Sequence, residues 1–193
     1  MTHEQGECKM LDINTGRFVI GEGLELYPGM KREDFFNSKI YKEELMHEED
    51  REDITNRQYC LKDQVIDGML MSVIIRFSLH DYVEDIILSK PEYYKWPNWP
   101  EDRTEEEYAY EIKAYNDAFV AKQLEGTEGM GPNLGYYPTK PWGYIRSNFN
   151  LRHMPHVEVV ISYNQVPILK AAGYTFGKRS PLDIIRGNMN KEE

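Results

Sequence analysis

Cysteine is scarce in this chain of 193 residues, which contains only Cys8 and Cys60. Two cysteines exclude a framework of several disulfides and a CxxC metal site, so we expect both thiols to be reduced. Long apolar runs are also missing, since no stretch approaches the roughly 20 apolar residues that span a bilayer. The polar, acidic start lacks the basic and apolar regions of a signal peptide. We therefore expect a cytoplasmic protein with no membrane contact.

Basic residues are too few to balance the acidic ones. Lys and Arg number 23 against 33 Asp and Glu, which gives a formal net charge of −10. This charge repels phosphate backbones and anionic headgroups within a Debye length, so direct binding of nucleic acid is not expected. A basic protein is the partner that the charge favours. The alternative is that the charge only keeps the protein soluble.

The length and composition fit one domain with a single core. About 40% of the residues are apolar and 12% are aromatic, which is enough to fill one substantial core in a chain of this size. The first sixteen residues are polar. We expect residues 1–16 to form a flexible segment and residues 17–193 to form a single α+β domain.

Residues 17–21 and 24–27 fit two short β segments, and alternation of apolar and polar residues further along predicts five longer strands in two groups. The strands cover residues 59–66, 69–77, 83–88, 142–149 and 157–163. Asp67-Gly68 separates the first two strands and favours the positive φ angles of a type I′ turn. The first three strands then form an antiparallel meander, and the last two form a C-terminal hairpin. The predicted fold class is α+β, with this antiparallel sheet packed against two main helices.

Two segments have the apolar spacing of a helix. Residues 104–124 begin with Thr104 and Glu107, whose spacing is that of a capping box, and carry an apolar stripe at steps of three and four. Residues 30–45 fit a shorter helix that packs on one face. The charged run at residues 43–53 has little to bury, and we interpret it as a solvated helix end and loop.

No catalytic constellation is recognisable in the sequence. There is no GxSxG nucleophile elbow and no cysteine in a glycine-rich turn. His153-x-x-His156 is the one close histidine pair, but Pro155 lies inside it, so a solvated turn is favoured over a zinc site. Glu84 and Asp85 are neighbours in a strand and are expected to point to opposite faces. We therefore predict no enzymatic activity, no metal and no cofactor.

Aromatic and acidic residues give better support for a binding surface. Tyrosine and tryptophan are enriched at interface hot spots, and here they lie close to carboxylates in the sequence. The structural alternative is that Trp96 and Trp99 only cap the core. The residues that we predict to contact a partner are Glu48, Glu49, Asp50, Glu52, Asp53, Trp99, Glu101, Asp102, Glu105, Glu106, Tyr136 and Tyr137.

Several short motifs occur in an order along the chain that is similar to the order in a known class of proteins. They are Pro28-Gly29-Met30 before a helix, Ile74-Ile-Arg-Phe77, Val83-Glu-Asp-Ile-Ile-Leu88, Trp142-Gly-Tyr-Ile-Arg-Ser-Asn-Phe149 and Val159-Val-Ile-Ser-Tyr163. Over about residues 17–163 the chain resembles small bacterial immunity proteins of contact-dependent and other polymorphic toxin systems. The helix followed by a meander also looks like small outer-membrane assembly lipoproteins and β-lactamase inhibitory proteins.

The resemblance to immunity proteins implies a cytoplasmic antitoxin that blocks the active site or the substrate surface of a cognate toxin. Nuclease toxins are generally basic, so an acidic inhibitor gains fast, steered association. Two other classes stay open. One is a homodimeric structural or adaptor protein joined through a strand edge or an aromatic loop. The other is a small enzyme with a site assembled from dispersed His, Asp and Glu residues.

Overall fold

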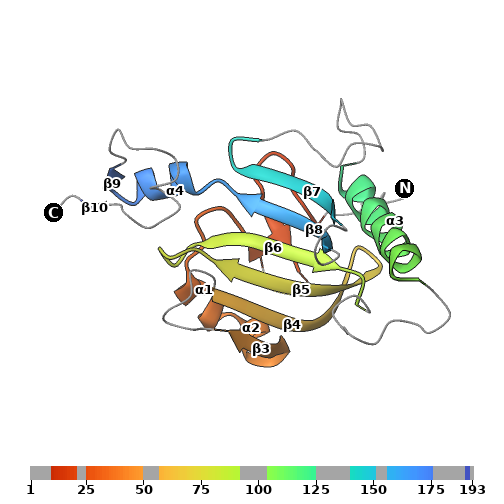
Figure 1. Cartoon of the computed structure of the whole chain (residues 1–193). Coiled ribbons are helices and arrows are strands. Elements are labelled where there is room, and N and C mark those ends of the chain that lie inside the picture. The colour runs from red at the N-terminus through yellow and green to blue at the C-terminus, as the bar shows by residue number, and fades with distance from the viewer. Residues whose placement is uncertain are drawn as a thin grey trace, which may run out of the picture.

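A single antiparallel sheet forms the frame of the protein (Figure 1). The computed structural model describes residues 10–20, 25–49, 57–91, 104–124, 140–150, 156–175 and 190–191. The sheet has six strands in the order β3-β4-β5-β6-β8-β7. These strands are β3 (Leu45–Glu49), β4 (Arg57–Ile66), β5 (Met69–Phe77), β6 (Val83–Ser89), β7 (Gly143–Asn150) and β8 (His156–Tyr163). The predicted α+β class, with its meander and C-terminal hairpin, is confirmed.

Four helices and two short ribbons complete the described part of the chain. The helices are α1 (Arg32–Asn37), α2 (Lys39–Glu44), α3 (Glu105–Gln123) and α4 (Gln165–Ala171). The ribbons are β1 (Phe18–Val19) paired with β2 (Glu25–Leu26), and β9 (Tyr174–Thr175) paired with β10 (Asn190–Lys191). None of the helices in these described ranges is long and apolar enough to cross a bilayer.

The turn between β4 and β5 has the geometry that Asp67-Gly68 predicts. Asp67 has a φ angle of 52° and Gly68 a φ angle of 75°. Two consecutive positive φ angles define a type I′ turn, whose twist matches that of the flanking strands. The turn therefore sets the register of the hairpin, in which Ile66 lies opposite Met69.

The C-terminal hairpin extends the meander on its β6 side. β7 and β8 pair without a register shift from Gly143 opposite Tyr163 to Asn150 opposite His156. β8 also pairs with β6, so the hairpin and the meander share one sheet. At the start of β7, a side-chain carbon on Gly143 would lie 1.8 Å from the backbone oxygen of Ser162. Only glycine fits this position.

Helix α3 begins with the predicted capping box. The Thr104 hydroxyl accepts a hydrogen bond from the Glu107 backbone N–H, and the Glu107 carboxylate accepts one from the Thr104 backbone N–H at 2.9 Å. Tyr108, Ile112 and Phe119 of the predicted stripe are buried. Through this stripe α3 packs on β7 and β8.

The helix predicted over residues 30–45 is instead two short helices. Ser38 is extended and separates α1 from α2, because its hydroxyl accepts a hydrogen bond from the Tyr41 backbone N–H and so caps α2. The chain then enters edge strand β3 at Leu45. The interpretation of the charged run as a helix end and loop is therefore wrong for residues 45–49, and residues 50–53 lie outside the described residues.

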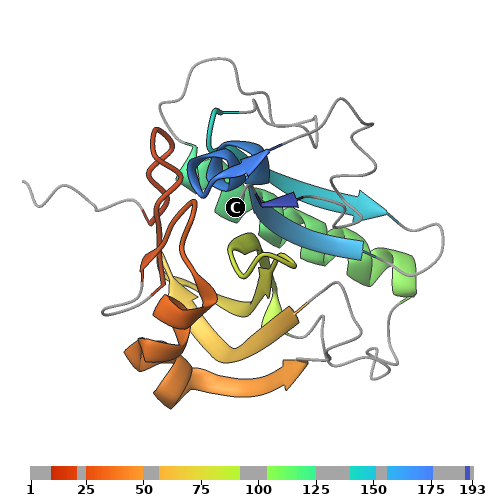
Figure 2. The ribbon, with the colours of Figure 1, turned by 90° about the vertical axis from the view of Figure 1, so that its left-hand side faces the viewer.

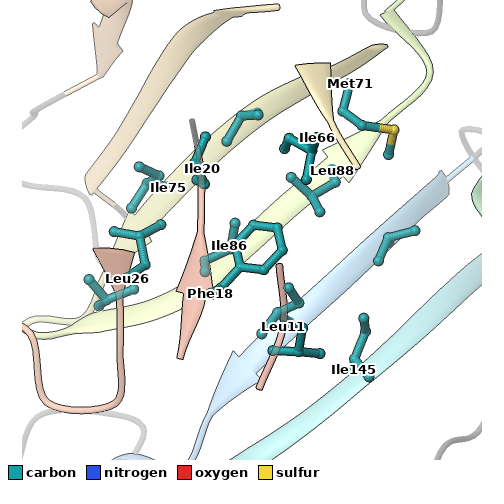
Figure 3. Packing of buried hydrophobic residues seen from close by; sticks show 14 of the residues in the cluster. Leu11, Phe18, Ile20, Leu26, Ile66, Met71, Ile75, Ile86, Leu88 and Ile145 are labelled. Atoms are coloured by element: carbon teal, nitrogen blue, oxygen red, sulfur yellow. The ribbon is translucent and has the colours of Figure 1, made fainter. Parts of the chain in front are cut away.

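The core lies on one face of the sheet (Figure 3). On this face a row of neighbouring side chains crosses five strands, and each is at most 1% exposed. The row consists of Tyr59, Ile75, Ile86, Ile161 and Ile145. Phe18 and Leu26 of the β1–β2 ribbon belong to the same buried cluster, so the ribbon covers this face of the sheet (Figure 2).

The N-terminal segment is part of the fold from Met10 onward. Leu11 is 1% exposed, and its backbone N–H donates to the side-chain oxygen of Gln123 in α3 at 3.1 Å. The indole N–H of Trp142 donates to the backbone oxygen of Ile13 at 2.9 Å. The expectation of a flexible segment over residues 1–16 is therefore corrected for residues 10–16, while residues 1–9 lie outside the described residues.

Candidate functional site

Only part of the predicted contact surface falls in the described part of the chain. Glu48 and Glu49 lie on edge strand β3, and Glu105 and Glu106 lie in the first turn of α3. The other predicted contact residues lie outside the described residues. They are Asp50, Glu52, Asp53, Trp99, Glu101, Asp102, Tyr136 and Tyr137.

The two acidic pairs that the structure describes belong to opposite corners of the sheet. β3 forms one edge of the sheet, whereas α3 packs on β7 and β8 at the other. β3 pairs with the first half of β4, where Glu49 lies opposite Gln58. The C-terminal end of α3 reaches the turn that follows β4, where Lys122 pairs with Asp67 at 2.9 Å. The structure therefore does not bring these two pairs together.

The first turn of α3 presents two carboxylates to solvent. Glu105 and Glu106 are exposed and form no ion pair in the part of the chain that the structure describes. The neighbouring carboxylate of Glu107 is occupied by the capping box. Negative charge at a helix N-terminus is stabilised by the helix dipole by about 0.3–1 kcal/mol. The two residues therefore support α3 locally and leave their charges accessible to a cation.

A polar row crosses the face of the sheet opposite the core. Its register neighbours are Gln58, Arg76, Asp85, Ser162 and Tyr144. Asp85 is only 7% exposed, and its carboxylate accepts a hydrogen bond from the Arg76 guanidinium. A charge with so little contact to water is stable only with a partner, so each of these two residues depends on the other.

Glu84 lies beside this ion pair because the strand register shifts there. Arg76 lies opposite Asp85, whereas the next residue, Phe77, lies opposite Val83. Burial raises the pKa of Glu84, Asp85 raises it further, and Arg76 opposes the change. The expectation that Glu84 and Asp85 act separately assumed strict alternation of side chains, which a bulge removes. The two carboxylates are close enough to influence each other.

The histidines form no metal site in the described residues, where no group of three or more His, Cys, Asp and Glu side chains is suited to a metal ion. The His80 ring lies against Tyr174 of β9, with 4.9 Å between ring centroids. Burial lowers the pKa of His80, and the charge of Asp81 partly offsets this effect. His153 lies outside the described residues, as do the side chains of His47 and His156.

A groove of about 560 Å³ opens between α4 and the start of β7. Trp142 lines it together with Pro28, Tyr82 and Ile168, and Lys31 is its charged lining residue. Small-molecule sites have volumes of about 300–1,000 Å³, so the size is compatible with a ligand. The groove joins segments that are far apart in the sequence, which is why no local pattern predicts it.

Comparison of the chain with protein-family models, with curated proteins and with solved structures finds no match. The resemblance to bacterial immunity proteins therefore stays a prediction. Function is inferred below from the charges and contacts of the described residues.

Proposed function

We propose that the protein is a cytoplasmic immunity protein that binds and neutralises a cognate, basic toxin of the nuclease type. The observation that carries the proposal is the pair of exposed carboxylates of Glu105 and Glu106, which have no ion-pair partner among the described residues. They belong to a chain with a formal net charge of −10. A surface of this kind attracts a cationic macromolecule and repels nucleic acid.

The basic residues of α3 do not offset these two carboxylates. Lys113 pairs with Asp117 within α3, and Lys122 pairs with Asp67 at 2.9 Å in the turn after β4. Both lysines of the helix are therefore already matched by carboxylates. The first turn of α3 keeps its surplus of negative charge, which is the feature that a basic partner would contact.

The expected contribution of these charges is larger for the rate of association than for affinity. An exposed pair of unit charges about 4 Å apart gains only about 1 kcal/mol in water, and salt screens it further. Long-range attraction nevertheless steers the encounter, and rim charges act mainly through the association rate. Substitutions at Glu105 and Glu106 should therefore slow binding more than they speed dissociation.

The test uses the binding partner captured from the cells that encode this chain. Glu106→Lys should lower the association rate constant about threefold to tenfold at about 0.05 M salt, and the difference should vanish at about 0.5 M salt. Glu33→Lys is the matched control, because Glu33 is exposed in the first turn of α1 and the substitution changes the charge equally. The proposal is wrong if the captured partner is acidic, or if Glu106→Lys lowers its association rate constant no more than the control Glu33→Lys does.

A further inference from the structure

Tyr110 is the most exposed aromatic side chain in the described part of the chain. It is 54% exposed, against 42% for Tyr27. Tyr110 lies four residues after Glu106 in α3, so the two side chains share one face of the helix. Tyrosine is among the residues that dominate the energy of protein interfaces. The exposed ring therefore marks this face of α3 as a contact surface for a partner.

The Tyr110 ring is held in place by β7. Its centroid lies 4.9 Å from that of Phe149, and the two ring planes are tilted by 36°. Phe149 itself packs on the buried cluster that contains Ile112 and Val157. A ring that is already ordered loses little conformational freedom when a partner binds, so more of its contact energy contributes to affinity.

The unmatched charge of this face is negative. Glu106 has no ion-pair partner among the described residues, whereas Lys113 is matched by Asp117 within α3. The exposed residues that follow Tyr110 at steps of four are small: Ala114 and Ala118. The net charge of −10 repels both nucleic acid and a second copy of this chain. Charge complementarity therefore favours a cationic protein on this face.

Elsewhere on α3 the protein already holds a cation between a tyrosine ring and a carboxylate. The Lys90 ammonium lies 5.9 Å from the centroid of the Tyr108 ring and pairs with the Glu111 carboxylate at 2.6 Å. Tyr108 and Glu111 are three residues apart, so both reach the same cation. Glu106 and Tyr110 present the same two groups at a spacing of four, and no cation of the described residues lies between them.

We propose that the partner docks on this face of α3 and places an arginine between the Tyr110 ring and the Glu106 carboxylate. The inference rests on the proposed function, which supplies a basic protein as the partner. Arginine is favoured over lysine because its planar guanidinium stacks on a ring while its N–H groups pair with a carboxylate. Binding covers the Tyr110 ring, so Tyr110 acts mainly on the dissociation rate, whereas Glu106 acts on the association rate through long-range attraction.

Surface plasmon resonance with the captured basic partner tests the docking face. Tyr110→Ala should raise the dissociation constant about tenfold to a hundredfold, and the increase should persist at about 0.5 M salt because it does not depend on charge steering. Tyr110→Phe keeps the ring and should raise the dissociation constant less than about threefold. Tyr27→Ala is the matched control, because it removes an exposed tyrosine outside α3, and it should leave binding unchanged.

A double-variant cycle tests the shared arginine. If one guanidinium contacts both side chains, Glu106→Gln combined with Tyr110→Ala should raise the dissociation constant by less than the product of the two single effects. Glu33→Gln combined with Tyr110→Ala should give the full product, because Glu33 lies in α1. The docking face is wrong if the Glu106 cycle is also multiplicative, or if Tyr110→Ala weakens binding no more than Tyr27→Ala does. The proposed function survives either result if Glu106→Lys still slows association, whereas an acidic captured partner overturns both.

Discussion

Replacing Gly16 with alanine should destabilise the protein by about 3 kcal/mol. Gly16 has a φ angle of 76°, in the left-handed region, where a side chain costs about 1 kcal/mol. The new carbon would also lie 2.5 Å from the ring of Trp142. Trp142 cannot move freely, because its indole N–H donates to Ile13 at 2.9 Å. Breaking that bond and repacking the ring should cost about a further 2 kcal/mol.

Gly68→Ala separates the two causes. Gly68 has a φ angle of 75°, but a side-chain carbon there would meet nothing within 4 Å. Urea unfolding followed by circular dichroism should therefore show a loss of about 1 kcal/mol for Gly68→Ala, and about 2 kcal/mol more for Gly16→Ala. Equal losses for the two variants would refute the packing of residues 10–16 against Trp142.

Three further predictions concern stability. Burial lowers the pKa of His80 below its ordinary value of 6.5, so the unfolded chain binds a proton more readily than the folded one. The free energy of unfolding should therefore fall as the pH drops below 6.5. Urea unfolding at several pH values should show a weaker fall for His80→Gln. Thr104→Ala should cost about 1 kcal/mol and Thr104→Ser much less, as measured by urea unfolding, because the hydroxyl caps α3. Asp85→Asn should cost about 2–4 kcal/mol by leaving Arg76 unpaired, and the double variant Arg76→Met/Asp85→Leu should recover most of it in the same assay.

Elements with a strong local signal could be predicted from the sequence. Asp67-Gly68 has few alternatives to a type I′ turn, and both residues take positive φ angles. Thr104 and Glu107 satisfy each other within one helical turn, so the start of α3 needs no information from the rest of the fold. The fold class followed from such features.

Elements held by distant contacts could not be predicted. Strand β3 is held by pairing with β4 on one side. Its sequence is mostly charged and does not alternate between apolar and polar residues, so no strand pattern is visible in it. Leu11 lies with Met10 and Ile13 in a short, mostly polar segment, and its backbone N–H donates to the side-chain oxygen of Gln123 in α3. The bulge at Glu84 depends on a mismatch between two strands and has no local signature. At this register shift the strict alternation that the sequence argument assumed for Glu84 and Asp85 does not hold.

The most direct measurement of the proposed function is growth of cells that express the captured partner with and without this chain. The partner should be basic, should arrest growth when expressed alone, and should lose its toxicity when the chain is co-expressed. A captured partner that is harmless, or whose toxicity is unchanged by the chain, would contradict an immunity role.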